Sequence, residues 1–122
     1  MERVAGVDEF DEIEFQAART GNHVRAAVRM SQLAREAEPR LRAESHLRAG
    51  EQWMMADDSQ RAADEFAAAI EDGGPTFADP RVYLARALLD LGRDTEAEQL
   101  LARLTDSATR SPRAPVICSP NC

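Results

Sequence analysis

"LGRDTEAEQLL" at residues 91–101 is the third occurrence of a phrase that this chain repeats, after TGNHVRAAVRM at residues 20–30 and MADDSQRAADEF at residues 55–66. Each copy has a polar turn, then an alanine, and a large apolar residue four positions after that alanine. The alanines are Ala26, Ala62 and Ala97, so the phrase recurs after 36 and then 35 positions. A period of this length predicts a stack of helix pairs, because one pair of short helices cannot bury its apolar face alone.

The body of the chain is rich in alanine and poor in β-branched residues, which favours helix throughout. Apolar residues three or four apart, with turn and capping residues between the runs, predict six helices: about 7–19, 23–37, 39–55, a fourth from the 57–59 turn to 71, 80–91 and 94–104. Asn22 and Asp79 are suitable caps, and Pro80 suits a first helical position. No strand is predicted, so the expected fold class is all-α.

The composition limits which classes of partner, and which cellular compartment, are expected for this protein. A length of 122 residues suits one domain, and 22 acidic against 15 basic residues argue against nucleic acid or an anionic membrane as the main partner. Every basic residue is arginine, which excludes lysine Schiff-base chemistry and a lysine-bearing phosphate loop and is typical of a GC-rich genome. With no apolar run of membrane-spanning length and an acidic N-terminus, a cytoplasmic, bacterial protein is expected.

Residues that would support catalysis or metal binding are sparse. His23 and His46 are the only histidines, and neither has a metal-ligand partner three or four positions away. No glycine-rich phosphate loop, Gly-x-Ser-x-Gly elbow or His-Glu-x-x-His motif occurs. The acidic run DEFDEIE suits the positive end of a helix dipole and needs no catalytic explanation. The sequence therefore predicts a protein that is not an enzyme and needs no cofactor or metal.

The last part of the chain has a different composition. Residues 107–122 contain three prolines, several serines and no apolar period, which predicts a disordered tail after a helical domain at residues 1–106. Both cysteines, Cys118 and Cys122, lie in this tail, so the domain has no disulfide framework. Their Cys-x3-Cys spacing leaves two alternatives open. The cysteines form a redox-sensitive thiol pair, or they lie in an unstructured tail and have no role.

The repeat has a sequence signature as well as a period. The middle unit has Gly50, Trp53, Ala62-x3-Phe66 and Pro75, and the third has Ala85, Leu88, Gly92 and Ala97-x3-Leu101. The first unit has Phe10, Gly21, Ala26-x3-Met30 and Pro39, but it carries Glu14 where a small residue belongs. The middle unit departs at His46 and Ala49. In this pattern the sequence resembles the tetratricopeptide repeat family over about residues 7–106.

The resemblance implies an all-α, right-handed α-α superhelix of three tetratricopeptide-like helix-turn-helix repeats, with units at about 7–40, 43–76 and 78–106. It also implies a protein–protein interaction module, of adaptor, scaffold or co-chaperone-like kind, that binds a peptide or partner helix in a concave groove. The first helix of each pair lines such a groove, which gives as candidate partner-binding residues Phe15, Arg19, Leu47, Arg48, Glu51, Met55, Val82, Tyr83 and Arg86.

The residues at the groove positions indicate what chemical groups a partner should carry. The Lys, Asn and Arg set with which one branch of the family holds a C-terminal carboxylate is absent, so that mode is not expected. An apolar strip bordered by carboxylates favours an arginine or lysine beside an apolar anchor. Three alternatives stay open: Leu47 and Met54 belong to the core, the protein forms a homodimer through its open C-terminal repeat, or it is a regulatory subunit whose tail thiols switch assembly.

Overall fold

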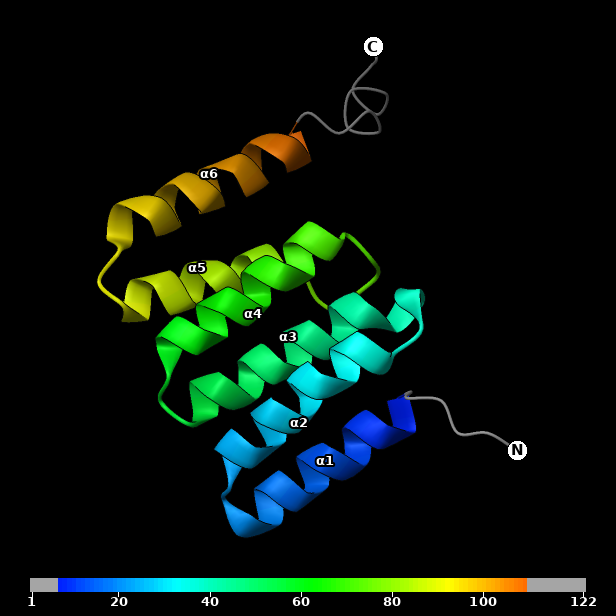
Figure 1. The fold of residues 1–122 in the computed structure, drawn as a ribbon. Helices are drawn as coiled ribbons and strands as arrows, with labels where there is room; N and C mark the ends of the chain where they lie inside the picture. The colour runs from blue at the N-terminus through cyan, green and yellow to red at the C-terminus, as the bar shows by residue number, and fades with distance from the viewer. Residues whose placement is uncertain (1–6, 110–122) are drawn as a thin grey trace.

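Six helices make up the part of the chain that the computed structural model describes, residues 7–109 for the backbone and 9–104 for the side chains. They are α1 (Val7–Thr20), α2 (His23–Glu36), α3 (Pro39–Met55), α4 (Ser59–Asp72), α5 (Pro80–Asp90) and α6 (Asp94–Thr109) (Figure 1). No strand occurs within these residues. The predicted all-α class is therefore confirmed.

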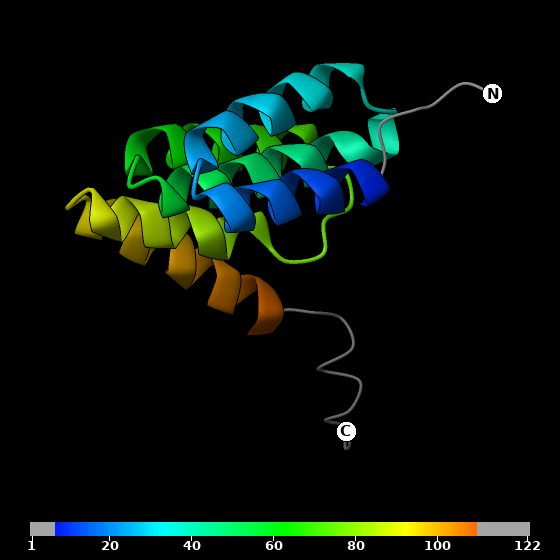
Figure 2. The same cartoon turned by 90° about the horizontal axis from the view of Figure 1, so that it is seen from below.

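The helices are stacked in chain order. Each helix packs against the one before it, so α1 lies at one end of the array and α6 at the other (Figures 1 and 2). Short turns join them, which makes neighbouring helices antiparallel and groups them as three pairs. The predicted helix-turn-helix arrangement is confirmed, while the right-handed superhelix stays a prediction.

The starts of α2, α4 and α5 are fixed by side-chain caps. The Oδ1 atom of Asn22 accepts a hydrogen bond from the Arg25 amide at 3.1 Å, and that of Asp58 accepts one from the Arg61 amide at 3.0 Å. Asp79 caps α5 in the same way, with Pro80 at the first helical position. These bonds satisfy amide groups that have no partner inside the helix. Asn22 and Asp79, the two caps expected from the sequence, both act as caps.

One boundary differs from the expectation. The sixth helix was predicted to end near residue 104, whereas α6 continues to Thr109. The apolar period does stop, but residues 105–109 contain neither glycine nor proline, so they are compatible with a helix. The rest of the predicted tail, with Cys118 and Cys122, lies outside the described residues.

The core runs along the array in three clusters. The central cluster joins Leu47 and Trp53 of α3 to Phe66 of α4 and to alanines of α2, α4 and α5. A second contains Phe10, Met30 and Leu33, and a third contains Ala85, Leu88, Ala97 and Leu100. Leu101, the large apolar residue of the third repeated phrase, is 39% exposed. The alternation of small and large residues lets the helices approach closely.

Polar groups inside the array are paired. The Ser45 hydroxyl donates to the Met30 carbonyl oxygen at 2.7 Å, and every fully buried side-chain nitrogen and oxygen among the described residues has a partner. Nδ1 of His23 lies 2.8 Å from Oε1 of Gln52, and Nδ1 of His46 lies 2.9 Å from Oε1 of Glu65. Both histidines therefore connect neighbouring helices.

Candidate functional site

A cleft opens between the first helices of the second and third pairs, and we name it the α3–α5 cleft. Its volume is about 570 Å³, and it is lined by Glu51, Met54, Met55, Phe66, Val82, Tyr83, Arg86 and Asp90. On α5 the lining residues are spaced at helical intervals, so they share one face of that helix. Phe66 of α4 is fully buried and forms the floor. The wall is therefore mostly apolar, with charged groups around it.

Tyr83 is the central side chain of the α3–α5 cleft. Its ring packs edge-to-face on Phe66, with ring centroids 5.4 Å apart, and on Phe77, with centroids 6.5 Å apart. Its hydroxyl is hydrogen-bonded to the Glu51 carboxylate. Burial raises the pKa of Tyr83, and the nearby negative charge of Glu51 raises it further. Tyr83 therefore presents a neutral ring between an apolar floor and a carboxylate.

The Glu51 carboxyl group is held in an environment that disfavours its charge. Burial raises its pKa above the ordinary value of 4.5, although the Tyr83 hydrogen bond opposes that shift. The charges of Glu14 and Glu44 raise this pKa as well, while that of Arg48 lowers it. A cation brought into the cleft by a partner would relieve this unfavourable charge.

Replacing Glu51 by glutamine is expected to raise the free energy of unfolding near neutral pH. The folded state of the natural protein binds the Glu51 proton more tightly than the unfolded chain, so the ionised carboxylate opposes folding. Glutamine removes the charge and keeps an acceptor for the Tyr83 hydroxyl. The gain should shrink as the pH falls through the folded-state pKa and vanish below 4.5. Urea denaturation across this pH range, with exposed Glu98→Gln as control, measures it; destabilisation at neutral pH would contradict it.

Arg48 forms a second polar cluster beside the cleft. Its guanidinium lies 2.6 Å from Glu44 Oε2 and 3.4 Å from both Asp11 Oδ1 and Glu14 Oε1. It also lies over two aromatic rings, 5.1 Å from the centroid of Phe10 and 5.7 Å from that of Phe77. Burial raises the pKa of Glu14, and Arg48 opposes that rise. One arginine therefore faces three carboxylates, which leaves this part of the surface negative.

The structure places the predicted groove residues in three different environments. Glu51, Met55, Val82, Tyr83 and Arg86 line the α3–α5 cleft. Phe15 and Arg19 are exposed on α1, where the Arg19 guanidinium lies 5.9 Å from the Phe15 ring centroid, away from that cleft. Arg48 lies between them, already paired with carboxylates.

Leu47 is a correction. It was predicted to line the groove, but it has no exposed surface and belongs to the central core cluster. It lies in the middle of α3, where residues of the neighbouring helices cover it completely. The alternative that placed Leu47 in the core is the correct one. Met54 has both roles, since it packs against that cluster and also lines the cleft.

Two residues beside the α3–α5 cleft are not among the nine predicted partner-binding residues. Phe77, in the loop between α4 and α5, is 61% exposed and contacts Tyr83 and Arg48 through its ring. Glu44 is buried and holds that loop, because its Oε1 accepts a hydrogen bond from the Phe77 amide at 2.9 Å. The only sequence signal was an aromatic residue in the longest break between helices, DGGPTFADP.

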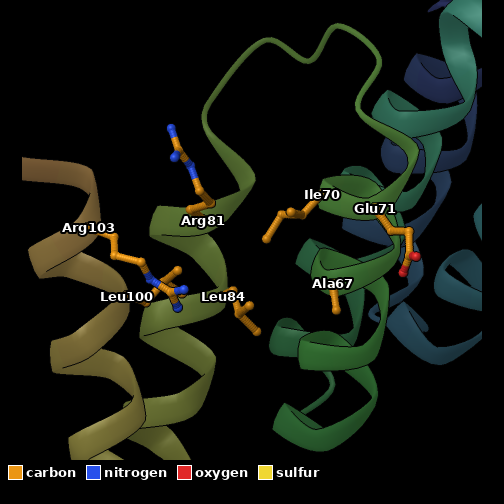
Figure 3. Close-up of a pocket in the computed structure, with 7 residues that line it drawn as sticks. All are labelled: Ala67, Ile70, Glu71, Arg81, Leu84, Leu100 and Arg103. Carbon is orange, nitrogen blue, oxygen red and sulfur yellow. The ribbon is translucent and has the colours of Figure 1, made fainter. Parts of the chain in front are cut away.

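A second cleft lies on the opposite face of α5. It has a volume of about 540 Å³ and is lined by Ala67, Ile70, Glu71, Arg81, Leu84, Leu100 and Arg103 (Figure 3). Two arginines against one glutamate make its border basic, whereas carboxylates predominate around the α3–α5 cleft. It contains no aromatic side chain and was not predicted from the sequence.

The described residues contain no group of three or more His, Cys, Asp or Glu side chains that could hold a metal ion. In the same part of the chain, no helix has both the length and the apolar character needed to cross a membrane.

Stacked antiparallel helix pairs, with small residues at the crossings and a cleft between first helices, define a helical-repeat protein. The family model described as tetratricopeptide repeat matches residues 54–114, half of the chain, and this protein belongs to that family. Members of the family generally mediate protein–protein interactions and are typically not enzymes. No curated protein and no solved structure gave a match.

Proposed function

We propose that this chain is an adaptor or scaffold that binds a peptide or helix of another protein in the α3–α5 cleft. The observation that carries the proposal is the composition of that cleft, where Met54, Met55, Val82 and Tyr83 provide an apolar wall between Glu51 and Asp90. Met55 and Val82 are exposed, at 59% and 50%. Methionine side chains adapt to differently shaped partners, which suits recognition of a peptide.

The charges favour a partner with an arginine or lysine beside an apolar anchor. Glu51 and Asp90 border the cleft against Arg86, and the neighbouring Arg48 cluster has more carboxylates than cations. A cationic side chain would be attracted to this surface, while an acidic segment would be repelled. The apolar anchor would bury the exposed surface of Met55 and Val82.

Within this chain, Arg48 already makes the kind of contact that we propose for an arginine of the partner. Its guanidinium lies over aromatic rings while carboxylates accept its hydrogen bonds. Arginine suits such a setting because its planar group stacks on a ring and donates at its edge. Tyr83, hydrogen-bonded to Glu51, offers a ring and a carboxylate in the same combination.

Selection from a random peptide library displayed on phage tests this proposal directly. We expect wild type to enrich peptides that carry arginine or lysine next to leucine, methionine or phenylalanine. Val82→Glu should weaken binding of the selected peptides at least about tenfold, since it places a carboxylate against their apolar anchor. Val24→Glu is the matched control, because Val24 is 48% exposed, similar to Val82, but lies on α2.

Titration of the selected peptides with salt separates the electrostatic contribution. Affinity should fall as salt rises, because part of the attraction is between exposed charges. Enrichment of acidic peptides, or equal binding to wild type and Val82→Glu, would show that the α3–α5 cleft is not the binding site.

A further inference from the structure

Phe77 lies at one end of the α3–α5 cleft. Its ring centroid is 5.7 Å from the guanidinium carbon of Arg48 on α3 and 6.5 Å from the ring centroid of Tyr83 on α5, so the ring contacts both helices that form the cleft. These two helices run in the same direction, because α4 runs back between them in the chain (Figure 1). Phe77 is therefore beside the start of α5, whereas Met55 and Asp90 line the cleft where the two helices end.

The buried carboxylate of Glu44 holds Phe77 in this position. Its Oε1 atom accepts a hydrogen bond from the Phe77 amide at 2.9 Å, and its Oε2 atom accepts one from Nε of Arg48 at 2.6 Å. Within the same loop, the Thr76 hydroxyl donates to the Ala78 carbonyl oxygen at 2.6 Å. The Phe77 ring is nevertheless 61% exposed. Holding an exposed ring in place before binding lowers the entropy cost of a contact with a partner.

The charge around the Phe77 end of the cleft is negative. Arg48 pairs there with one carboxylate of its own helix and with two of α1, so its positive charge is outweighed. Glu51, one turn further along α3, bonds the Tyr83 hydroxyl and has no arginine at ion-pairing distance among the described residues. The middle of the cleft is less negative because Arg86 lines it. A cation of a partner is therefore attracted to the Phe77 end.

We propose that the exposed ring of Phe77 is the subsite for an arginine of the partner, an inference that rests on the proposed function of the α3–α5 cleft. The guanidinium of the partner stacks on this ring and faces the carboxylates of α3. Arg48 makes the same type of contact from within the chain, over the Phe77 ring and with its Nε bonded to Glu44.

This subsite discriminates between the two cations that the charge of the cleft would accept equally. The guanidinium of arginine is planar and weakly hydrated, so it can stack on an aromatic ring while its edge donates to carboxylates. The ammonium group of lysine is compact and strongly hydrated, and it has no planar face. The ring of Phe77 therefore makes the cleft select arginine over lysine.

A double-mutant cycle between the protein and a synthetic peptide tests this inference. A peptide from the library selection is synthesised in two forms, with arginine or lysine at its cationic position, and its affinity is measured by fluorescence anisotropy. Wild type should bind the arginine form at least about fivefold more tightly than the lysine form. Phe77→Leu keeps an apolar side chain but removes the ring, so this preference should disappear.

Phe15→Leu is the matched control for the loss of an exposed ring. Phe15 is 57% exposed and also has a guanidinium near its ring, that of Arg19 at 5.9 Å, but it lies on α1, away from the α3–α5 cleft. Its replacement should leave the arginine preference unchanged. Circular dichroism of both variants checks that the helix content of wild type is retained.

The outcomes separate this inference from the function on which it rests. If Val82→Glu weakens binding of both peptides while wild type binds them equally, the cleft is the binding site but Phe77 does not select arginine. If Phe77→Leu weakens both peptides by the same factor, the ring contacts an apolar part of the peptide and the arginine subsite is excluded. If the selection enriches no peptide, or Val82→Glu binds both forms as tightly as wild type, the proposed function fails and this inference fails with it.

Discussion

Leu47→Ala should lower the free energy of unfolding by about 3 kcal/mol. Leu47 is fully buried, and it packs in the cluster that joins α3 to residues of α2, α4 and α5. Removing three carbons there loses the hydrophobic stabilisation of the side chain and leaves a cavity that close-packed helices cannot fill. Because the cluster lies in the middle of the array, the loss affects all three helix pairs. Urea denaturation followed by circular dichroism measures it.

Met55→Ala is the matched control, on the same helix and of similar side-chain size. Met55 is 59% exposed, so its truncation should change stability by less than about 0.5 kcal/mol. In peptide binding the order should reverse, because Met55 lines the α3–α5 cleft and Leu47 does not. Equal destabilisation by the two substitutions would show that Leu47 is not part of the core.

The repeat period and the caps were sufficient to predict the fold. Asn22 and Asp79 start the helices expected to follow them, and the alanines of the repeated phrase are buried at helix crossings. These features are local or periodic, so one sequence reveals them. The end of α6 was harder to place, because residues 105–109 have helix-compatible side chains but no apolar period.

The candidate site was less predictable, because burial depends on position along a helix as well as on its face. Leu47 and Met54 are seven residues apart on α3 and therefore share a face. Leu47 is nevertheless covered by neighbouring helices, whereas Met54 lies near the end of α3, where the cleft opens. Periodicity predicts on which face of a helix a residue lies, but it does not predict how deeply neighbouring helices bury that residue.

Contacts between segments that are far apart in the sequence could not be predicted from the sequence alone. Glu14 stands where a small residue was expected, and the structure explains this through its interaction with Arg48 on α3, 3.4 Å away. Phe77 reaches the site because the buried Glu44 carboxylate holds its loop. Neither contact follows from spacing, since each depends on how the helix pairs are stacked.

Gly50→Ala is expected to destabilise the protein by about 2 kcal/mol, although alanine is the better helix former by about 1 kcal/mol. A Cβ atom at Gly50 would lie 2.3 Å from one ring carbon of Phe66 and within 2.8 Å of two others. Phe66 is fully buried, so its ring cannot swing into solvent. The added methyl group must therefore push α3 and α4 apart. Thermal or urea unfolding of the variant measures the loss.

The double variant Gly50→Ala with Phe66→Leu shows whether this contact is the cause. Phe66→Leu alone should be destabilising, because it removes ring atoms from the central cluster and from the floor of the α3–α5 cleft. The smaller leucine leaves room for the alanine methyl group, so the double variant should be more stable than the sum of the two losses by at least about 1 kcal/mol. Additive losses would mean that the methyl group disturbs α3 by some other route. A positive coupling would instead show that close packing of α3 on α4 requires glycine at position 50, because only glycine leaves room for the aromatic ring that Tyr83 packs against.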